Sequence, residues 1–375
     1  MKILLADDSP TSRHLAEKAV QDLGHDCRVA VDGAEAWELL QEYDPEVVIS
    51  DWVMPEVDGE ELCRRIRATP ERPYVYFVML TSLEDRDYVL RGMEAGADDY
   101  LVKPLDRSEL RMRLIAASRV TRLHRDLRRR QQETEKEIEL AAGIQRSLLP
   151  GRPPQVDGVA IAGHCFPATN VGGDCFDYMA DEQGRLVTFI ADVAGHSISS
   201  ALLMAMGRST LRREIGTGAS PAAVLEATNR AMYEDLVNTE LFITMFCARY
   251  DPATRTLEYA NAGHNPPFLR HDGGVEDLDG EGAAIGILEG VEFEPKRTEL
   301  GPGDRLLLYT DGAMEALDEG GTQFGEERLR ALLGERSDAP PADFLDHAYG
   351  AVSAHAGGAP QQDDITLLAL QGEES

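Results

Sequence analysis

The sequence predicts an α/β unit with a doubly wound parallel sheet of five strands, then a long helix, then an α+β unit. Three observations predict this arrangement. Residues 2–105 alternate short apolar runs with helix-like segments, a pattern typical of parallel sheets with crossover helices. Residues 107–149 contain no Pro and no Gly except Gly143, which favours one continuous helix. In residues 151–372, helical stretches are grouped among strand-like runs, as in α+β folds.

Composition limits the class of protein. At about 150 residues per domain, 375 residues predict two or three domains. With 43% apolar and 28% charged residues, the chain is globular rather than disordered. The cysteines number 5 and form no CxxC pair, so we expect no disulfide framework or zinc ribbon and a reducing, cytoplasmic environment. No apolar run approaches the ~20 residues that span a bilayer, and acids come too early at the N-terminus for a signal peptide. We therefore expect no membrane partner.

The charge of the chain is strongly acidic and uneven. The formal net charge of −30 disfavours nucleic acid as a partner, because phosphate repels an acidic surface. Residues 107–149 are the exception, with 11 basic and 6 acidic residues. Many acids elsewhere are clustered as Asp after apolar runs, which indicates sites for divalent cations.

The first unit contains five apolar runs, at residues 3–6, 27–31, 47–50, 74–80 and 100–102, with helical patterns such as 10–23 and 59–67 between them. In such sheets the site lies beyond the carboxyl ends of the strands. The polar side chains expected to converge there are Asp7, Asp8, Asp51, Thr81 and Lys103.

Three carboxylates at one rim repel one another unless a cation lies among them. Mg²⁺ prefers such oxygen ligands and keeps waters for a phosphoryl group. A lysine and a hydroxyl group nearby can hold phosphoryl oxygens. The site could therefore accept a phosphoryl group on a carboxylate, with Asp51 as the nucleophile.

These residues resemble the receiver domain of bacterial two-component response regulators. The motifs are Asp7-Asp8, Asp51-Trp52-Val53-Met54-Pro55, Thr81-Ser82 and Lys103-Pro104, within residues 1–106. The resemblance implies that a sensor histidine kinase phosphorylates Asp51. It also implies that Mg²⁺ binds Asp7, Asp8, Asp51 and the Val53 carbonyl, and that Thr81, Tyr100 and Lys103 are switch residues. For Tyr100, ordinary half-buried packing is the alternative.

The helical segment has a seam of alternating four- and three-residue steps at positions 116, 120, 123, 127, 130, 134, 137, 141, 144 and 148. The seam is apolar at both ends and polar at Arg130, Thr134 and Glu137. It indicates a coiled coil, and so a homodimer through the linker; a solvated basic connector is the alternative. Pro150 ends the helix. We therefore expect a receiver at 1–106, a helical linker at 107–149 and a further domain at 150–375.

The last unit has strand-like runs at 159–162, 186–193, 242–250, 257–260, 305–310 and 365–370, and helical stretches at about 198–215 and 221–236. Four Asp-centred motifs accompany them: 171–177 (VGGDCFD), 191–196 (ADVAGH), 309–312 (YTDG) and 362–366 (QDDIT). A carboxylate at a strand end beside Gly can meet a metal where the backbone must also approach. Without a matching His or Cys set, Mn²⁺ or Mg²⁺ is expected rather than Zn²⁺. Two such ions can activate water for displacement at phosphorus.

This set of motifs resembles the metal-dependent protein phosphatases (PPM, or 2C-like), closest to the SpoIIE and RsbU branch. The segments 144–150 (IQRSLLP), 259–267 (YANAGHNPP) and 324–329 (FGEERL) add to the resemblance. It implies a β-sandwich flanked by helices and a protein serine/threonine phosphatase. Carried over by position, Asp192 would bridge two Mn²⁺ or Mg²⁺ ions, with the Val193 carbonyl on the second. Asp311 and Asp363 would complete the first metal, and Asp174 would serve the other.

Several neighbouring residues have structural interpretations. Asp177 and Asp364 are expected to be structural, and His196 and His264 to fix loops. Ser197 stands where the family usually has Gly, and it can cap the following helix. Cysteines 165, 175 and 247 are expected in the core.

Two functions follow from the resemblance. In the first, receiver phosphorylation controls a phosphatase that acts on a phosphorylated anti-sigma-factor antagonist. In the second, catalysis is weak and the receiver and linker sequester an anti-sigma regulator. The presence of all four metal-site acids favours the first, and Mn²⁺-dependent phosphate release would discriminate between them. No helix-turn-helix pattern or basic domain follows the receiver, which disfavours a DNA-binding output.

Overall fold

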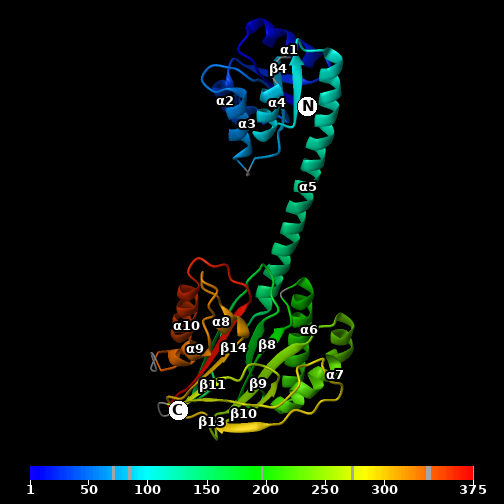
Figure 1. Ribbon diagram of the computed structural model, residues 1–375. Helices are drawn as coiled ribbons and strands as arrows, with labels where there is room; N and C mark the ends of the chain where they lie inside the picture. The colour runs from blue at the N-terminus through cyan, green and yellow to red at the C-terminus, as the bar shows by residue number, and fades with distance from the viewer. Residues whose placement is uncertain (70–71, 83–85, 196, 272–273, 335–338, 375) are drawn as a thin grey trace. The chain divides into compact units, whose positions relative to one another are not determined.

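The structure is a computed structural model that describes residues 1–69, 72–82, 86–195, 197–271, 274–334 and 339–374 (Figure 1). The chain divides into two compact units, Met1–Glu135 and Lys136–Ser375. The division falls inside helix α5 (Arg107–Leu148), which contributes to both units. Among the described helices, none combines the length and apolarity that crossing a bilayer requires.

The first unit is a five-stranded sheet in the order β2-β1-β3-β4-β5, and every neighbouring pair is parallel. The predicted doubly wound sheet is confirmed. Its elements besides α5 are β1 (Lys2–Ala6), α1 (Pro10–Asp22), β2 (Asp26–Ala30), α2 (Gly33–Tyr43), β3 (Val47–Asp51), α3 (Gly59–Arg67), β4 (Tyr76–Ser82), α4 (Arg86–Glu94) and β5 (Asp99–Lys103).

Helices cover both faces of this sheet, which explains why the inner strands β1 and β3 are buried along nearly their whole length rather than at alternate residues. Residues of α2 and α3, such as Leu40 and Leu62, pack on one face. Residues of α1 and the start of α5, such as Val20 and Leu114, pack on the other. The start of α1 follows from its sequence, because Ser9 caps it and Pro10 occupies its first turn.

The second unit holds two five-stranded sheets, ordered β13-β10-β9-β8-β7 and β12-β11-β14-β15-β6, with antiparallel pairing throughout. The elements are β6 (Val159–Phe166), β7 (Cys175–Ala180), β8 (Leu186–Val193), α6 (Ile198–Ile215), α7 (Pro221–Thr239), β9 (Ile243–Asp251), β10 (Thr256–Ala262), β11 (Phe268–His271), β12 (Gly274–Asp277), β13 (Lys296–Glu299), β14 (Arg305–Tyr309), α8 (Asp311–Glu315), α9 (Glu326–Leu332), α10 (Pro341–Ala356) and β15 (Ile365–Gly372).

The two sheets pack face to face as a sandwich. Side chains such as Ile190 and Phe246 from one sheet meet Leu308 and Leu368 from the other in a shared core. Helices α6 and α7 cover the outer face of the first sheet, and α8, α9 and α10 cover that of the second (Figure 1). The predicted α+β sandwich flanked by helices is confirmed.

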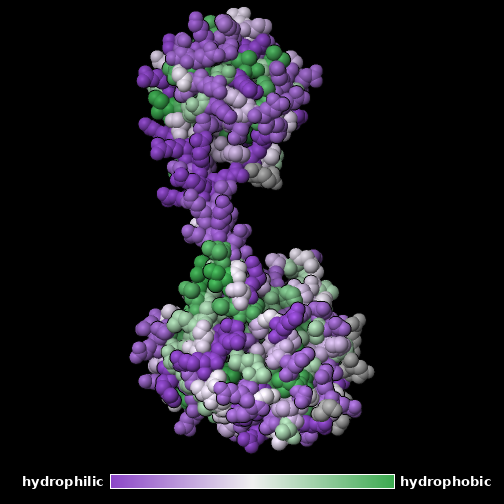
Figure 2. Space-filling view, turned by 180° about the vertical axis from the view of Figure 1, so that it is seen from behind, coloured by the Kyte–Doolittle hydropathy of each residue, from purple (hydrophilic) through white to green (hydrophobic). Residues whose placement is uncertain are grey.

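Helix α5 is buried only near its ends. Leu114 is 2% exposed in the first unit and Ala142 is 2% exposed in the second. The stretch between them is hydrophilic in the space-filling view, and apolar surface appears toward the C-terminal end of the helix (Figure 2). The exposed apolar side chains on α5 include Leu123, Leu127 and Ile144. The structure contains one chain, so the predicted helix pairing stays a prediction.

Candidate functional site

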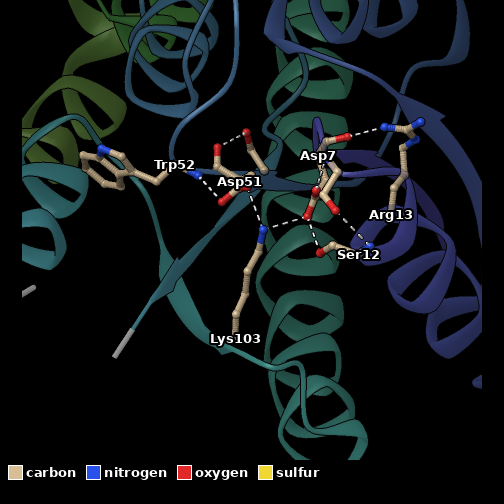
Figure 3. Close-up of polar contacts among 8 residues, drawn as sticks. Asp7, Ser12, Arg13, Asp51, Trp52 and Lys103 are labelled. Carbon is tan, nitrogen blue, oxygen red and sulfur yellow. Dashed lines mark hydrogen bonds and ion pairs between the residues drawn. The ribbon is translucent and has the colours of Figure 1, made fainter. Parts of the chain in front are cut away.

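Two groups of acids lie at strand ends, one in each unit. In the first unit, Asp7 is fully buried and Lys103 Nζ lies 2.8 Å from its Oδ2 and 2.6 Å from Asp51 Oδ2 (Figure 3). Ligand oxygens of Asp7, Asp8 and Asp51 lie within 4.8 Å of one another. The parallel order of β1, β3 and β5 therefore brings together four of the predicted rim residues.

The electrostatics of this rim depend on Lys103. Burial raises the pKa of Asp51 above its ordinary value, and the Lys103 ammonium only partly opposes this. Burial also acts to lower the pKa of Lys103, but Asp51 and Asp7 outweigh it and the pKa is raised. The lysine therefore stays charged between the carboxylates. Asp7 is fixed by Ser9 N–H at 2.9 Å and by the Ser12 hydroxyl at 2.6 Å.

The remaining predicted receiver residues lie near the same edge in different environments. Thr81 is buried at the end of β4. Tyr100 is 38% exposed on β5, and the guanidinium carbon of Arg113 lies 5.9 Å from the centre of its ring. The Val53 side chain is 67% exposed in the segment after β3.

In the second unit, the four predicted acids come from both sheets. Asp192 lies in β8, and Asp174 directly precedes β7, which pairs with β8. Asp311 opens α8 directly after β14, and Asp363 lies in the loop before β15. The ends of the two packed sheets thus bring together residues that are up to 189 positions apart, as the numbering gives.

Asp364 holds the loop that carries Asp174. Its Oδ2 accepts a hydrogen bond from Gly173 N–H at 2.8 Å and a longer one from Asp174 N–H at 3.4 Å, and its Oδ1 accepts from Ala168 N–H at 2.8 Å. The packing leaves no space for a side chain, because a methyl group on Gly172 would overlap the Asp364 carboxylate. This supports the structural interpretation of Asp364.

Burial and neighbouring carboxylates raise the pKa of Asp174, Asp192 and Asp311. Burial, then the Asp192 carboxylate, raises the pKa of Asp174 well above its ordinary value. Burial, then Asp311 and Asp363, raises the pKa of Asp192. Hydrogen bonds oppose this rise in pKa, among them the one that the Thr310 hydroxyl donates to Asp174 Oδ2 at 2.7 Å.

These carboxylates fit divalent cations. Among the described residues, no Arg, Lys or His side chain forms an ion pair with Asp174, Asp192, Asp311 or Asp363, whereas the nearby Asp177 pairs with two arginines. Asp174 is buried, and Asp192, Asp311 and Asp363 are partly buried. Carboxylates withdrawn from water without a cationic partner are costly unless a metal binds them. Their hard oxygen atoms suit Mg²⁺ or Mn²⁺.

The predicted structural residues are held as follows. Asp177 is fully buried and pairs with Arg208 at 2.8 Å and Arg212 at 2.6 Å, so it ties β7 to α6. His264 Nδ1 shares a 2.9 Å hydrogen bond with the Thr244 hydroxyl, and the Asn261 side chain bonds both main-chain groups of His264. Burial lowers the pKa of His264 to about 4, so its ring is neutral.

Two further predictions concern the turn after β8 and the cysteines. Ser197 caps α6 by accepting from Ser200 N–H, and its φ of −99° requires no glycine. The preceding His196 lies outside the described residues. Cys175 and Cys247 are buried as predicted, while Cys165 is only partly buried.

One contact was not predicted. The Gln145 side chain donates to the Gly172 carbonyl at 2.6 Å and accepts from Gly172 N–H at 3.1 Å. The end of α5 thus binds the loop that leads to Asp174. The only sequence signal for this contact is the 144–150 segment itself, in which Gln145 is the amide side chain.

Comparisons with known proteins find a match for each of the two units. The family model described as Stage II sporulation protein E (SpoIIE) matches residues 182–372, and the response regulator receiver domain model matches residues 3–115. Phosphoserine phosphatase RsbU of Bacillus subtilis is 32% identical over 250 residues, which are 66% of this chain and 73% of RsbU. A chemotaxis protein CheY homolog of Campylobacter jejuni is 36% identical over 116 residues, which are 30% of this chain and 89% of that protein.

A solved structure shares the fold of the second unit. The SiaA-PP2C domain of Pseudomonas aeruginosa matches with a TM-score of 0.57 and 26% identity, over 65% of this chain and 98% of that domain. Its likeness, the RsbU match and the buried acids at the sheet ends support the same enzyme class. The chain therefore belongs to the SpoIIE family of metal-dependent protein serine/threonine phosphatases and carries a response-regulator receiver domain in its N-terminal unit.

Proposed function

We propose that a sensor histidine kinase phosphorylates Asp51, and that this controls removal of phosphate from a phosphorylated anti-sigma-factor antagonist. The name of RsbU describes a phosphoserine phosphatase, which supports phosphoserine as the reacting group. The antagonist as substrate comes from the likeness to the SpoIIE and RsbU branch.

The catalytic assignment depends on the second group of acids. Asp174, Asp192, Asp311 and Asp363 would hold two Mn²⁺ or Mg²⁺ ions, with the Val193 carbonyl as a further ligand. When bound, such ions supply Lewis-acid charge for the attack of water on phosphorus. The observation that carries this assignment is the convergence of these four acids at the ends of the two sheets, where the described residues include no cationic partner for them.

The input is assigned to the rim of the parallel sheet. Asp7, Asp8, Asp51 and the Val53 carbonyl would hold Mg²⁺, and Lys103 Nζ, at 2.6 Å from Asp51, is placed to contact a phosphoryl oxygen. Thr81 at the end of β4 would report the phosphorylation together with Tyr100.

The linker assignment extends this to a dimer. The proposal takes residues 1–106 as receiver, 107–149 as linker and 150–375 as phosphatase, with two copies paired through the linker. Exposed apolar side chains on the predicted seam, including Leu123, Leu127 and Ile144, support pairing.

The test uses the purified full chain with Mn²⁺ and candidate phosphorylated antagonist proteins. Phosphate release is measured with and without a phosphoryl mimic on Asp51, and the Asp192→Asn variant serves as the catalytically inactive control. A Mn²⁺-dependent release that changes with the mimic supports the proposal. Tight binding of an anti-sigma regulator without phosphate release would instead favour the weakly catalytic binding module.

A further inference from the structure

A pocket of about 380 Å³ adjoins the acids of the phosphatase unit. Its walls come from α8, from α10 and from the segment that leads into β15, elements that lie together over the outer face of the second sheet (Figure 1). Its volume falls in the range of ligand pockets, about 300–1,000 Å³. Gly312 and Asp363 line it, so the pocket lies beside the acids assigned to catalysis.

The lining of the pocket mixes apolar side chains with neutral polar groups. Val352 and Ile365 are buried in its wall, and Leu317, Ala356 and Pro360 add apolar surface. The neutral polar side chains are Gln323, Ser353, Gln361 and Gln362. Such a mixed surface suits a neutral side chain together with the peptide groups beside it.

The charge of the lining is negative. Glu315 and Asp363 are the acids among the described lining residues, and no Arg, Lys or His is among them. Glu315 lies one helical turn after Asp311 in α8 and lines the pocket. Asp363 is assigned to a metal ion, so Glu315 is the acid that an acidic substrate side chain would meet, with no compensating cation among the described lining residues.

The geometry points to a specificity pocket that binds the substrate residues next to phosphoserine, accepts a neutral side chain and disfavours an acidic one. The inference rests on the proposed function, because it takes the four acids as the place where phosphate is removed. One side of the substrate chain then lies along α10, and Glu315 sets the charge preference. Part of Gln361 is already used, since its amide group donates to Phe166 O at 2.7 Å and Asp363 O at 2.8 Å and so fixes the pocket wall.

The test compares phosphoserine peptides that differ only in the residues flanking phosphoserine, with Leu or Glu at each. The small substrate p-nitrophenyl phosphate, which has no residues flanking its phosphate, reports the catalytic centre without the flanking peptide. The filling variant is Ser353→Trp, at an exposed position of α10 that lines the pocket. The matched control is Ala354→Trp, at the next exposed position, which does not line it.

We expect Ser353→Trp to lower kcat/KM for the Leu peptide about tenfold, within the range that pocket contacts give, mainly through KM. Hydrolysis of p-nitrophenyl phosphate should stay within about twofold of the parent, and Ala354→Trp should match the parent on both substrates. Glu315→Gln should narrow the preference for the Leu peptide over the Glu peptide. If Ser353→Trp does not fold, Gln362→Trp on the exposed loop replaces it.

Two outcomes would refute the proposal that this pocket binds the substrate. In one, the filling variant hydrolyses the Leu peptide as the parent does. In the other, it loses activity on the peptide and on p-nitrophenyl phosphate equally, which would place the effect at the acids. A parent protein that hydrolyses neither substrate with Mn²⁺ overturns the proposed function itself, and this result is distinct from both.

Discussion

Changing either of two adjacent acids, Asp363 and Asp364, to asparagine should have opposite effects. Asp364→Asn should lower stability, whereas Asp363→Asn should remove activity and leave stability nearly unchanged. Asp364 accepts hydrogen bonds from Ala168, Gly173 and Asp174, and an amide has only one oxygen to offer. Whichever way the new side-chain amide turned in Asp364→Asn, at least one of these N–H groups would face its NH₂ group. Asp363 accepts one bond, from Asp364 N–H at 2.8 Å, which an asparagine oxygen can keep.

The magnitudes follow from this count. A buried donor left unsatisfied costs about 1–3 kcal/mol, so Asp364→Asn should destabilise the phosphatase unit by roughly that amount. Part of the cost is offset, because Asp364 also adds to the repulsion at Asp174 and Asp192. Asp363→Asn should leave stability within about 0.5 kcal/mol of the parent and remove metal-dependent turnover, since Asp363 would hold the first metal.

The assay must resolve the two units. Both tryptophans, Trp37 and Trp52, lie in the first unit, so tryptophan fluorescence does not report unfolding of the phosphatase unit. Calorimetry of the metal-free full chain and amide hydrogen exchange over residues 168–174 avoid this problem. Exchange in Asp364→Asn should be faster by about tenfold per 1.4 kcal/mol of lost local stability. Parent-like exchange in Asp364→Asn together with a destabilised Asp363→Asn would refute the assignment of roles.

Three other predictions follow from the proposed function. Mn²⁺ should raise the melting temperature of the parent's phosphatase unit, because it binds the folded state preferentially. Asp192→Asn should lose most of this rise, which calorimetry with and without a chelator measures. An equal rise in both proteins would contradict the assignment of Asp192 to the metal site. Asp51→Asn should keep basal turnover and lose the response to a phosphodonor. In the parent, this response corresponds to a coupling free energy of about 1–3 kcal/mol between the two units. A full response in Asp51→Asn would show that another group accepts the phosphoryl group. One residue inserted near Gln131 turns the downstream helix by ~100° and should uncouple turnover from Asp51 phosphorylation. Seven inserted residues return the helix to within ~20° of its original orientation and should preserve the coupling. If both insertion variants are regulated like the parent, the linker is a passive tether.

Sequence patterns were sufficient to predict an element where the element is long, and to predict a site residue where its motif lies at a strand end. The five strands of the receiver and the span of β8 at 186–193 were predicted closely, because apolar runs of this kind have few other solutions. The positions of Asp51 and Asp192 followed from the same strand ends. Such patterns were not sufficient for β11, β12 and β13, which have four residues each, or for α8, α9 and α10.

The supporting contacts of the catalytic site escaped prediction for a different reason. Asp364 binds Gly173 from 191 positions away, and the Thr310 hydroxyl reaches Asp174 across 136 positions. No local pattern encodes such pairs, since only the packing of two sheets sets them. The acids themselves could be found because each sits beside Gly in a motif or at a strand end, while the residues that orient them could not.

Helix α5 reaches the acids of the phosphatase through one residue, and this contact gives a last prediction. Gln145 makes both of its hydrogen bonds to Gly172, two residues before Asp174. Asp311 and Asp363 are carried by α8 and the loop before β15, to which Gln145 makes neither of these bonds. Removing the amide with Gln145→Ala should therefore free the Asp174 loop alone, at a cost of about 1–3 kcal/mol for the unsatisfied groups of Gly172.

The expected result is a Mn²⁺ titration of turnover shifted to about tenfold higher concentration, with faster amide exchange over residues 168–174. The matched control is Gln131→Ala on the exposed middle of the same helix, which should titrate like the parent. Because Asp174 is the acid whose loop α5 holds, a signal that turns or shifts the helix would reach the site there first. A parent-like titration for Gln145→Ala would mean that the helix end only packs against the phosphatase, and any control by the receiver would then need a route that bypasses the Asp174 loop.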